Sequence, residues 1–146
     1  MLSKISESTN TDLPRLFEIW ESSVRATHAF LAESDIQALI PLVQTGLAHC
    51  PSIYCLRDET ERPFAFLGVD NEKIEMLFVH ADFRSKGAGR LLVQFALKSL
   101  KAHLVDVNEQ NPLAIGFYEH LGFKVIGRSE FDSSGNPFPI LHMSLA

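Results

Sequence analysis

The residues best suited to hold a ligand lie in a short glycine-containing stretch, Arg84–Arg90. Gly87 and Gly89 leave the backbone without Cβ atoms, so a ligand can approach the main chain closely. The apolar pattern predicts a helix that begins here, and the free N–H groups of a helix N-terminus attract anions. The same spacing also fits a glycine turn with solvated basic residues. Positive charge that would suit a pyrophosphate comes from Arg84, Lys86 and Arg90.

Two other kinds of phosphate-binding loop can be compared with this stretch. The P-loop pattern GxxxxGK[ST] does not occur in the sequence. A dinucleotide fingerprint is closer, because Asp106 follows Gly87 at about the expected distance. Its third glycine is missing, however, since Gly89 is followed by Arg90, Leu91 and Leu92. The loop alone therefore predicts an anion site and leaves a nucleotide-binding domain open as an alternative.

Three side chains elsewhere could move protons. Tyr118 carries a phenol with an ordinary pKa of about 10 that could donate a proton, although a core tyrosine fits its spacing as well. Glu75 lies on a predicted strand and could accept a proton directly or through water, or it could be a solvated carboxylate. His28 has an ordinary pKa of about 6.5 and lies in the segment 25–31, which neither periodicity explains. The other histidines lack ligand spacing, so no metal is predicted.

An alternation of predicted strands and helices positions these residues. The predicted strands are Leu2–Glu7, Ser52–Leu56, Pro63–Val69, Lys73–His80, His103–Val107, Phe123–Phe131 and Ile140–Leu145. The predicted helices begin after Thr11 or Asp12, at a capping box formed by Ser34–Gln37, after Gly89, and at Leu113, the last ending at Leu121. Pro41 predicts a kink or break in the second helix. This order predicts an α+β (mixed α/β) fold with a mostly antiparallel sheet of about seven strands flanked by about four helices.

Composition narrows the class of protein. The 146 residues carry 13 Lys and Arg against 18 Asp and Glu, a formal net charge of −5. This balance argues against nucleic acid or anionic membranes as partners, since both are bound by clustered positive charge. The sequence has no secretory signal and no apolar run that could span a bilayer. Cys50 and Cys55 lack zinc-ligand spacing and are interpreted as reduced thiols. We therefore expect one domain over residues 1–146, in the cytoplasm.

Two motifs together resemble a known family. The stretch RSKGAG at Arg84–Gly89 resembles the R/Q-x-x-G-x-G/A motif of the GNAT superfamily of acetyl-CoA-dependent N-acetyltransferases. The stretch NPLAIGFYEHLGF at Asn111–Phe123 resembles that family's N-x-x-A-x-x-F-Y-x-x-x-G-F segment. With the order of elements, the resemblance covers essentially the whole chain. Trp20–Leu31 and Val107–Asn111 are similar to one bacterial branch, the YjaB-type acetyltransferases. Lys86 departs mildly from the pattern, because many members have glycine there.

The resemblance implies a GNAT-like sheet whose strands splay at the site of acetyl-CoA, the acyl donor. It implies that the pantetheine arm lies along the splayed strand and that the pyrophosphate lies on the glycine loop. The cofactor-binding residues implied in this way are Leu77, Phe78, Val79, Arg84, Ser85, Lys86, Gly87, Ala88, Gly89, Arg90, Asn111, Ala114 and Phe117. Asn111 is also expected to cap a helix, and the two roles are compatible.

The function implied by the resemblance is transfer of an acetyl group to a primary amine of a small molecule or peptide, by direct attack on the thioester. Tyr118 is then the general acid and Glu75 the candidate base. Oligomeric state is expected to be monomer or homodimer. A non-catalytic acyl-CoA-binding sensor or partner-binding module with the same fold stays open as the alternative. Residues expected to bind the acceptor are Trp20, His28, Phe30 and Asn108.

Overall fold

The computed structural model describes residues 5–145, so the first part of the predicted strand Leu2–Glu7 lies outside the described residues. The helices are α1 (Leu13–Thr27), α2 (Glu33–His49), α3 (Ala88–Ser99) and α4 (Pro112–His120). The strands are β1 (Ile5–Glu7), β2 (Ser52–Arg57), β3 (Pro63–Asp70), β4 (Lys73–Val79), β5 (Leu104–Asn108), β6 (Lys124–Ser129) and β7 (Ile140–Ser144). Two short 3-10 turns, Asn10–Asp12 and Ala81–Phe83, precede α1 and the glycine loop.

All the strands belong to one seven-stranded sheet with the order β1-β2-β3-β4-β5-β7-β6. Every neighbouring pair is antiparallel except β4 and β5, which are parallel. The C-terminal hairpin is inverted in the sheet, because β7 and not β6 lies beside β5. The predicted order of elements and the mixed, mostly antiparallel fold class are therefore confirmed.

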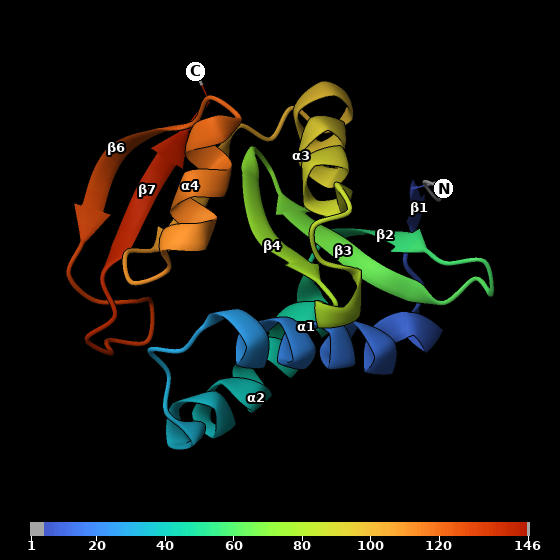
Figure 1. The fold of residues 1–146 in the computed structure, drawn as a ribbon, viewed down its shortest axis with the longest axis horizontal. Helices are drawn as coiled ribbons and strands as arrows, with labels where there is room; N and C mark the ends of the chain where they lie inside the picture. The colour runs from blue at the N-terminus through green and yellow to red at the C-terminus, as the bar shows by residue number, and fades with distance from the viewer. Residues whose placement is uncertain (1–4, 146) are drawn as a thin grey trace.

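The helices cover the two faces of the sheet differently (Figure 1). Helices α1 and α2 lie together on one face of the β1–β4 half, and α3 lies on the other. Each face of the sheet has its own hydrophobic cluster. Strand β3 contributes to both clusters, because its side chains alternate between the two faces. Phe66 packs in the cluster with Leu16 and Trp20 of α1, whereas Leu67 packs with Leu92 of α3. Helix α4 packs beside β5 and β7, so that the site described below lies between the two halves of the sheet.

The second helix differs from its prediction at two positions. Its N-cap is Ala32 and not Ser34, and the carboxylate of Asp35 accepts a hydrogen bond of 2.8 Å from the N–H of Ala32. Pro41 lies inside α2 without breaking it. The proline is exposed, so the carbonyl of Gln37, which loses its helical partner, lies on the side open to water. Of the predicted kink or break, the break is therefore wrong, and the kink stays a prediction.

A partly buried ion pair ties the start of α1 to the sheet. The Nη2 group of Arg57, at the end of β2, donates to the carboxylate of Asp12 at 2.8 Å. Its Nε group also donates to the hydroxyl of Ser6 on β1, at 2.9 Å. The side chains of Arg57 and Asp12 are only 19% and 13% exposed. The pair therefore holds α1 against the outer strands in a place largely shielded from water.

Candidate active site

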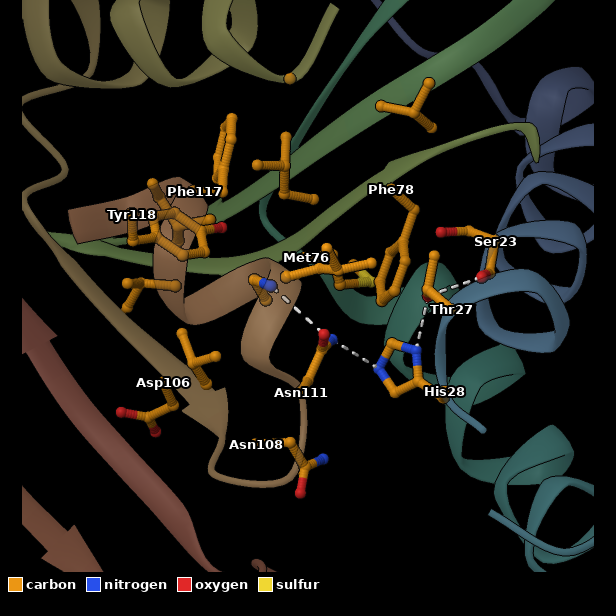
Figure 2. Close-up of a pocket in the computed structure, with 18 of the residues that line it drawn as sticks. Ser23, Thr27, His28, Met76, Phe78, Asp106, Asn108, Asn111, Phe117 and Tyr118 are labelled. Atoms are coloured by element: carbon orange, nitrogen blue, oxygen red, sulfur yellow. Dashed lines mark hydrogen bonds between the residues drawn. The ribbon is translucent and has the colours of Figure 1, made fainter. Parts of the chain in front are cut away.

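Strands β4 and β5 separate soon after they pair. Within residues 5–145 they are matched only at Lys73–Leu104 and Ile74–Val105. Beyond these pairs β4 still bonds to β3 along its other edge, so its edge toward β5 has no strand partner. A cavity of about 440 Å³, here called the central cavity, fills the gap and is closed by α4 and the end of α1 (Figure 2). An extended ligand can hydrogen-bond to such a free strand edge.

The loop before α3 borders a second cavity of about 760 Å³, here called the loop cavity. Gly87 has a φ of +83°, in the left-handed region that favours glycine. The first hydrogen bond into α3 runs from Leu91 N to Gly87 O, at 3.0 Å. The N–H groups of residues 86–90 consequently have no acceptor within residues 5–145. The loop cavity therefore offers free donors to an anion.

The loop cavity and the central cavity adjoin, because four residues line both. These are Val79 at the end of β4, Arg84 in the loop, Gly89 in the first turn of α3, and Phe117 on α4. Together the two cavities form a path from the N-terminus of α3 along the free edge of β4. A ligand with an anionic end and an extended arm fits this shape.

Tyr118 faces the central cavity from α4. Its side chain is buried, and its ring packs edge-on against Phe117 and Phe123, with ring centroids 5.0 Å and 5.3 Å away. No hydrogen bond to its hydroxyl group is found within residues 5–145. Burial raises the pKa of Tyr118 well above its ordinary value. The residue is therefore a phenol at neutral pH, the form that can donate a proton.

Asn111 is the buried residue at which α4 begins. Its Oδ1 atom accepts a hydrogen bond of 3.2 Å from the N–H of Ala114, and Pro112 follows as the first helical residue. This is the cap that the sequence predicts for asparagine before proline. The Nδ2 group of Asn111 faces the Nε2 atom of His28 at 3.5 Å. The helix cap is thereby linked to the end of α1.

His28 is brought to the site by the termination of α1. It is the C-cap of that helix, and its N–H donates to Val24 O at 2.8 Å. Its Nδ1 atom lies 2.8 Å from the hydroxyl of Thr27. In Figure 2 the ring lies across the cavity from Tyr118, with Asn111 between them. Burial lowers the pKa of His28, so that the neutral ring predominates at pH 7.

A third cavity, here called the side cavity, lies next to the central cavity and has a volume of about 240 Å³. It is lined by side chains of α1, α2 and the loop between β6 and β7. His28, Phe78 and Asn108 line both the side and the central cavity. The Oδ1 atom of Asn108 is buried and has no hydrogen-bond partner within residues 5–145. Two carboxylates, those of Asp35 and Asp132, are part of the wall.

The structure brings most of the residues predicted from the sequence to these three cavities. Those lining the central cavity are His28, Glu75, Leu77, Phe78, Val79, Arg84, Gly89, Asn108, Asn111, Ala114, Phe117 and Tyr118. The loop cavity adds Ser85, Gly87, Ala88 and Arg90. Of these, Glu75 is exposed at the edge of the central cavity.

Three residues that were predicted to bind the acceptor or the cofactor are less clearly part of the cavities. Trp20 lines the side cavity but is only 4% exposed and belongs to the core around α1. Phe30 lines none of the three cavities, and its ring packs against His28 with a centroid distance of 5.3 Å. Lys86 also lines none of them. Its Nζ atom lies 5.8 Å from the centre of the Phe83 ring.

Several site residues were missed by sequence reasoning. Ser23 and Thr27 line the central cavity, and their spacing of four residues on one helix face was the available signal. Asp132 and Phe138 come from the loop between β6 and β7, where no periodicity marks a binding residue. Asp106 lines the central cavity and pairs with Lys73, which suits a structural role in joining β5 to β4.

No group of three or more His, Cys, Asp or Glu side chains in residues 5–145 could hold a metal ion. Both cysteines are free thiols. No helix within the same residues is long and apolar enough to cross a bilayer.

Comparison with known proteins identifies the class that this fold and site define. Residues 58–145 match the model of the acetyltransferase (GNAT) domain. The chain is 38% identical over 143 residues to the peptidyl-lysine N-acetyltransferase YjaB of Salmonella typhimurium, covering 98% of each chain. It is also 38% identical over 144 residues to YjaB of Escherichia coli, covering 99% of this chain and 97% of that one. The chain therefore belongs to the GNAT acetyltransferase family and is an N-acetyltransferase.

The solved structure of apo-form YjaB from Escherichia coli has the same fold. It superposes with a TM-score of 0.91 at 37% identity, over 100% of this chain and 99% of that chain. The resemblance to YjaB-type acetyltransferases that was drawn from Trp20–Leu31 and Val107–Asn111 is thus confirmed.

Proposed function

We propose that this protein transfers the acetyl group of acetyl-CoA to a primary amine, and that the amine belongs to a lysine side chain of a peptide or protein. One observation supports this most strongly. The anion-binding loop, the free edge of β4 and the phenol of Tyr118 adjoin one another along the central and loop cavities. This arrangement suits a long thioester with a pyrophosphate at one end and a reacting carbonyl at the other.

In this proposal the loop holds the pyrophosphate. The donors are the free N–H groups of residues 86–90, with positive charge from Arg84 and Arg90. The pantetheine arm extends along Leu77–Val79, where β4 has no partner on the side of β5. Asn111, Ala114 and Phe117 form the opposite wall. Ser85, Lys86, Gly87, Ala88 and Gly89 complete the loop around the anionic end.

Tyr118 is the proposed general acid. When the amine attacks the thioester carbonyl, the C–S bond breaks and a thiolate leaves. The phenol of Tyr118 lines the cavity and is protonated at neutral pH, so it is placed to supply the proton that the sulfur needs. Glu75 is a candidate for removing a proton from the amine, because it lies at the edge of the same cavity.

The side cavity is the proposed path for the acceptor. It opens on the central cavity at His28, Phe78 and Asn108, and the acyl donor does not occupy it in this arrangement. Its apolar walls suit the methylene stem of a lysine, and Asp35 and Asp132 suit neighbouring positive charge. The printed names of the related enzymes, peptidyl-lysine N-acetyltransferases, support the same acceptor class. A small-molecule amine is the other candidate.

The experiment is an acetylation assay with purified protein, acetyl-CoA and a lysine-containing peptide. Released thiol and acetylated peptide are measured together, because each transfer produces one molecule of both. We expect equal amounts of both, and neither in the absence of peptide beyond slow hydrolysis. Acetyl-CoA that binds without transfer to peptides or to a panel of small amines would support the alternative, a non-catalytic acyl-CoA-binding sensor.

A further inference from the structure

The hydrogen bonds around His28 determine which ring nitrogen carries the proton. The hydroxyl of Thr27 lies 2.7 Å from the carbonyl oxygen of Ser23. A carbonyl only accepts, so the single proton of Thr27 Oγ1 must be donated to Ser23. The contact of 2.8 Å between Thr27 Oγ1 and His28 Nδ1 therefore needs its proton from the ring. His28 consequently carries its proton on Nδ1 and has a lone pair on Nε2.

Asn111 leads to the same tautomer from the other side of the ring. Its Oδ1 atom accepts from the N–H of Ala114, which fixes the orientation of the amide group. The group that faces His28 is therefore the NH₂, which can only donate. Its contact with Nε2, at 3.5 Å, requires a lone pair there. At this distance the bond is weak, so the lone pair remains available to a ligand.

His28 lies where the two substrates are proposed to meet. Its ring belongs to both the central and the side cavity, and burial lowers the pKa of the imidazole below its ordinary value. On α1, the neighbouring Arg25 is paired with Glu21 and Glu33. The other titratable groups that line the two cavities with His28 are Glu75, Arg84, Asp106, Tyr118, Asp35 and Asp132.

We infer that Nε2 of His28 is the general base that takes the proton from the attacking amine, with Thr27 and Asn111 as the positioning residues that present its lone pair. The inference rests on the proposed function, and it assigns the proton acceptor to His28 in preference to Glu75. Figure 2 shows the chain of contacts from Ser23 through Thr27 and His28 to Asn111.

In the proposed step the acetyl group moves from the sulfur of coenzyme A to the nitrogen of the amine. The neutral amine R–NH₂ attacks the thioester carbonyl, a C–N bond forms, and one N–H proton passes to Nε2 of His28. The C–S bond breaks, and the departing sulfur receives the phenolic proton of Tyr118. The products are the amide R–NH–CO–CH₃ and the free thiol of coenzyme A. One proton then passes through water from the imidazolium of His28 to the phenolate of Tyr118, which returns both side chains to their neutral forms.

The main test compares wild-type enzyme with His28→Gln, using acetyl-CoA and a lysine peptide. We expect kcat to fall by about 10²–10⁴-fold, while the KM for acetyl-CoA stays within about twofold. When kcat/KM of the wild type for the peptide is divided by kcat/KM of His28→Gln, the titration of the amine itself cancels. This ratio should fall as pH is lowered through the pKa of His28. A ratio of wild type to His28→Gln that is constant with pH would overturn the inference. So would a ratio of wild type to Glu75→Gln that falls at low pH while the ratio of wild type to His28→Gln does not.

Two further measurements protect against a variant that merely misfolds. In the unmodified protein, a long-range ¹H–¹⁵N correlation spectrum should show His28 protonated on Nδ1 and unprotonated on Nε2, and the opposite tautomer would overturn the inference. Thr27→Val removes the acceptor of the Nδ1 proton while keeping the side-chain shape. It should lower kcat, whereas Thr27→Ser, which keeps the hydroxyl, should restore it. Equal activity in the two variants would remove Thr27 from this role.

Failure of this inference can be told apart from failure of the proposed function. A wild-type protein that binds acetyl-CoA but acetylates no amine overturns both. A wild-type protein that acetylates the peptide, with His28→Gln folded and equally active, overturns the assignment of the base alone.

Discussion

Gly89, in the first turn of α3, lies directly against the ring of Phe117 on α4. A Cβ atom added to Gly89 would lie 3.2 Å from Cζ of Phe117 and 3.4 Å from Cε1. Both residues line the central and the loop cavity. The glycine therefore keeps two helices close together at the junction through which the acyl donor is proposed to pass. Gly87 differs, because a Cβ there would meet nothing within 4 Å and its positive φ is the constraint.

Gly89→Val should weaken binding of acetyl-CoA by about tenfold or more, which corresponds to about 1.4 kcal/mol. The branched side chain would push Phe117 into the cavity or block approach to the backbone. Lys86→Ala should cause a smaller loss, because the amine is exposed and its attraction is screened by salt. Calorimetric titration measures both, with circular dichroism as the control for folding. Equal losses would mean that the loop acts by charge and not by its backbone.

Tyr118→Phe should lower kcat by about 10²–10⁴-fold, as expected for loss of a general acid. The dissociation constant of acetyl-CoA should change by less than about twofold. The melting temperature should also be preserved, because the ring contacts with Phe117 and Phe123 remain and no hydrogen bond is lost. Single-turnover kinetics check that chemistry limits the rate. Unchanged turnover under those conditions would assign Tyr118 a purely structural role.

Trp20→Ala and Phe30→Ala should separate core packing from acceptor binding. Trp20 is only 4% exposed, so its truncation should lower the free energy of unfolding by about 3–5 kcal/mol. Phe30 is partly exposed and packs on His28 and Phe138, whose ring centroids lie 5.3 Å and 6.1 Å away. Its truncation should raise the KM for the peptide with a smaller loss of stability. Urea unfolding and steady-state kinetics give both quantities. Comparable loss of stability in the two variants would place Phe30 in the core.

Local motifs made much of the candidate site predictable from sequence. The glycine loop and the Asn111–Tyr118 segment are contiguous stretches, so their residue order already specifies a helix start, a cap and a phenol about two helical turns after that cap. The contact between His28 and Asn111 was not predictable, because it joins residues 83 positions apart and depends on where α1 ends. Pro41 shows the same limit. Its effect depends on whether the unpaired carbonyl faces water, which only tertiary structure determines.

Asp12→Asn should destabilise the fold in a way that depends on pH. The hydrogen bond from Arg57 lowers the pKa of Asp12 below its ordinary value, so the carboxylate is favoured in the folded state. The stability that the Asp12 carboxylate contributes is fully present above the pKa that an aspartate has in the unfolded chain, about 3.9. It is lost as pH falls through the lower pKa that Asp12 has in the folded protein. At pH 7 the variant should lose about 1.5–3 kcal/mol, the range for hydrogen bonds to charged groups.

Urea unfolding of wild type and Asp12→Asn at pH 7 and again below pH 4 checks this, since the difference between them should shrink at the lower pH. Glu18→Gln is the matched control. Glu18 also pairs with arginines, at 3.4 Å from both Arg15 and Arg62, but its side chain is 57% exposed. Exposed pairs contribute little, so this variant should unfold like wild type at pH 7. A loss in Asp12→Asn that is the same at both pH values would show that packing of the Asp12 side chain, and not its charge, stabilises the start of α1.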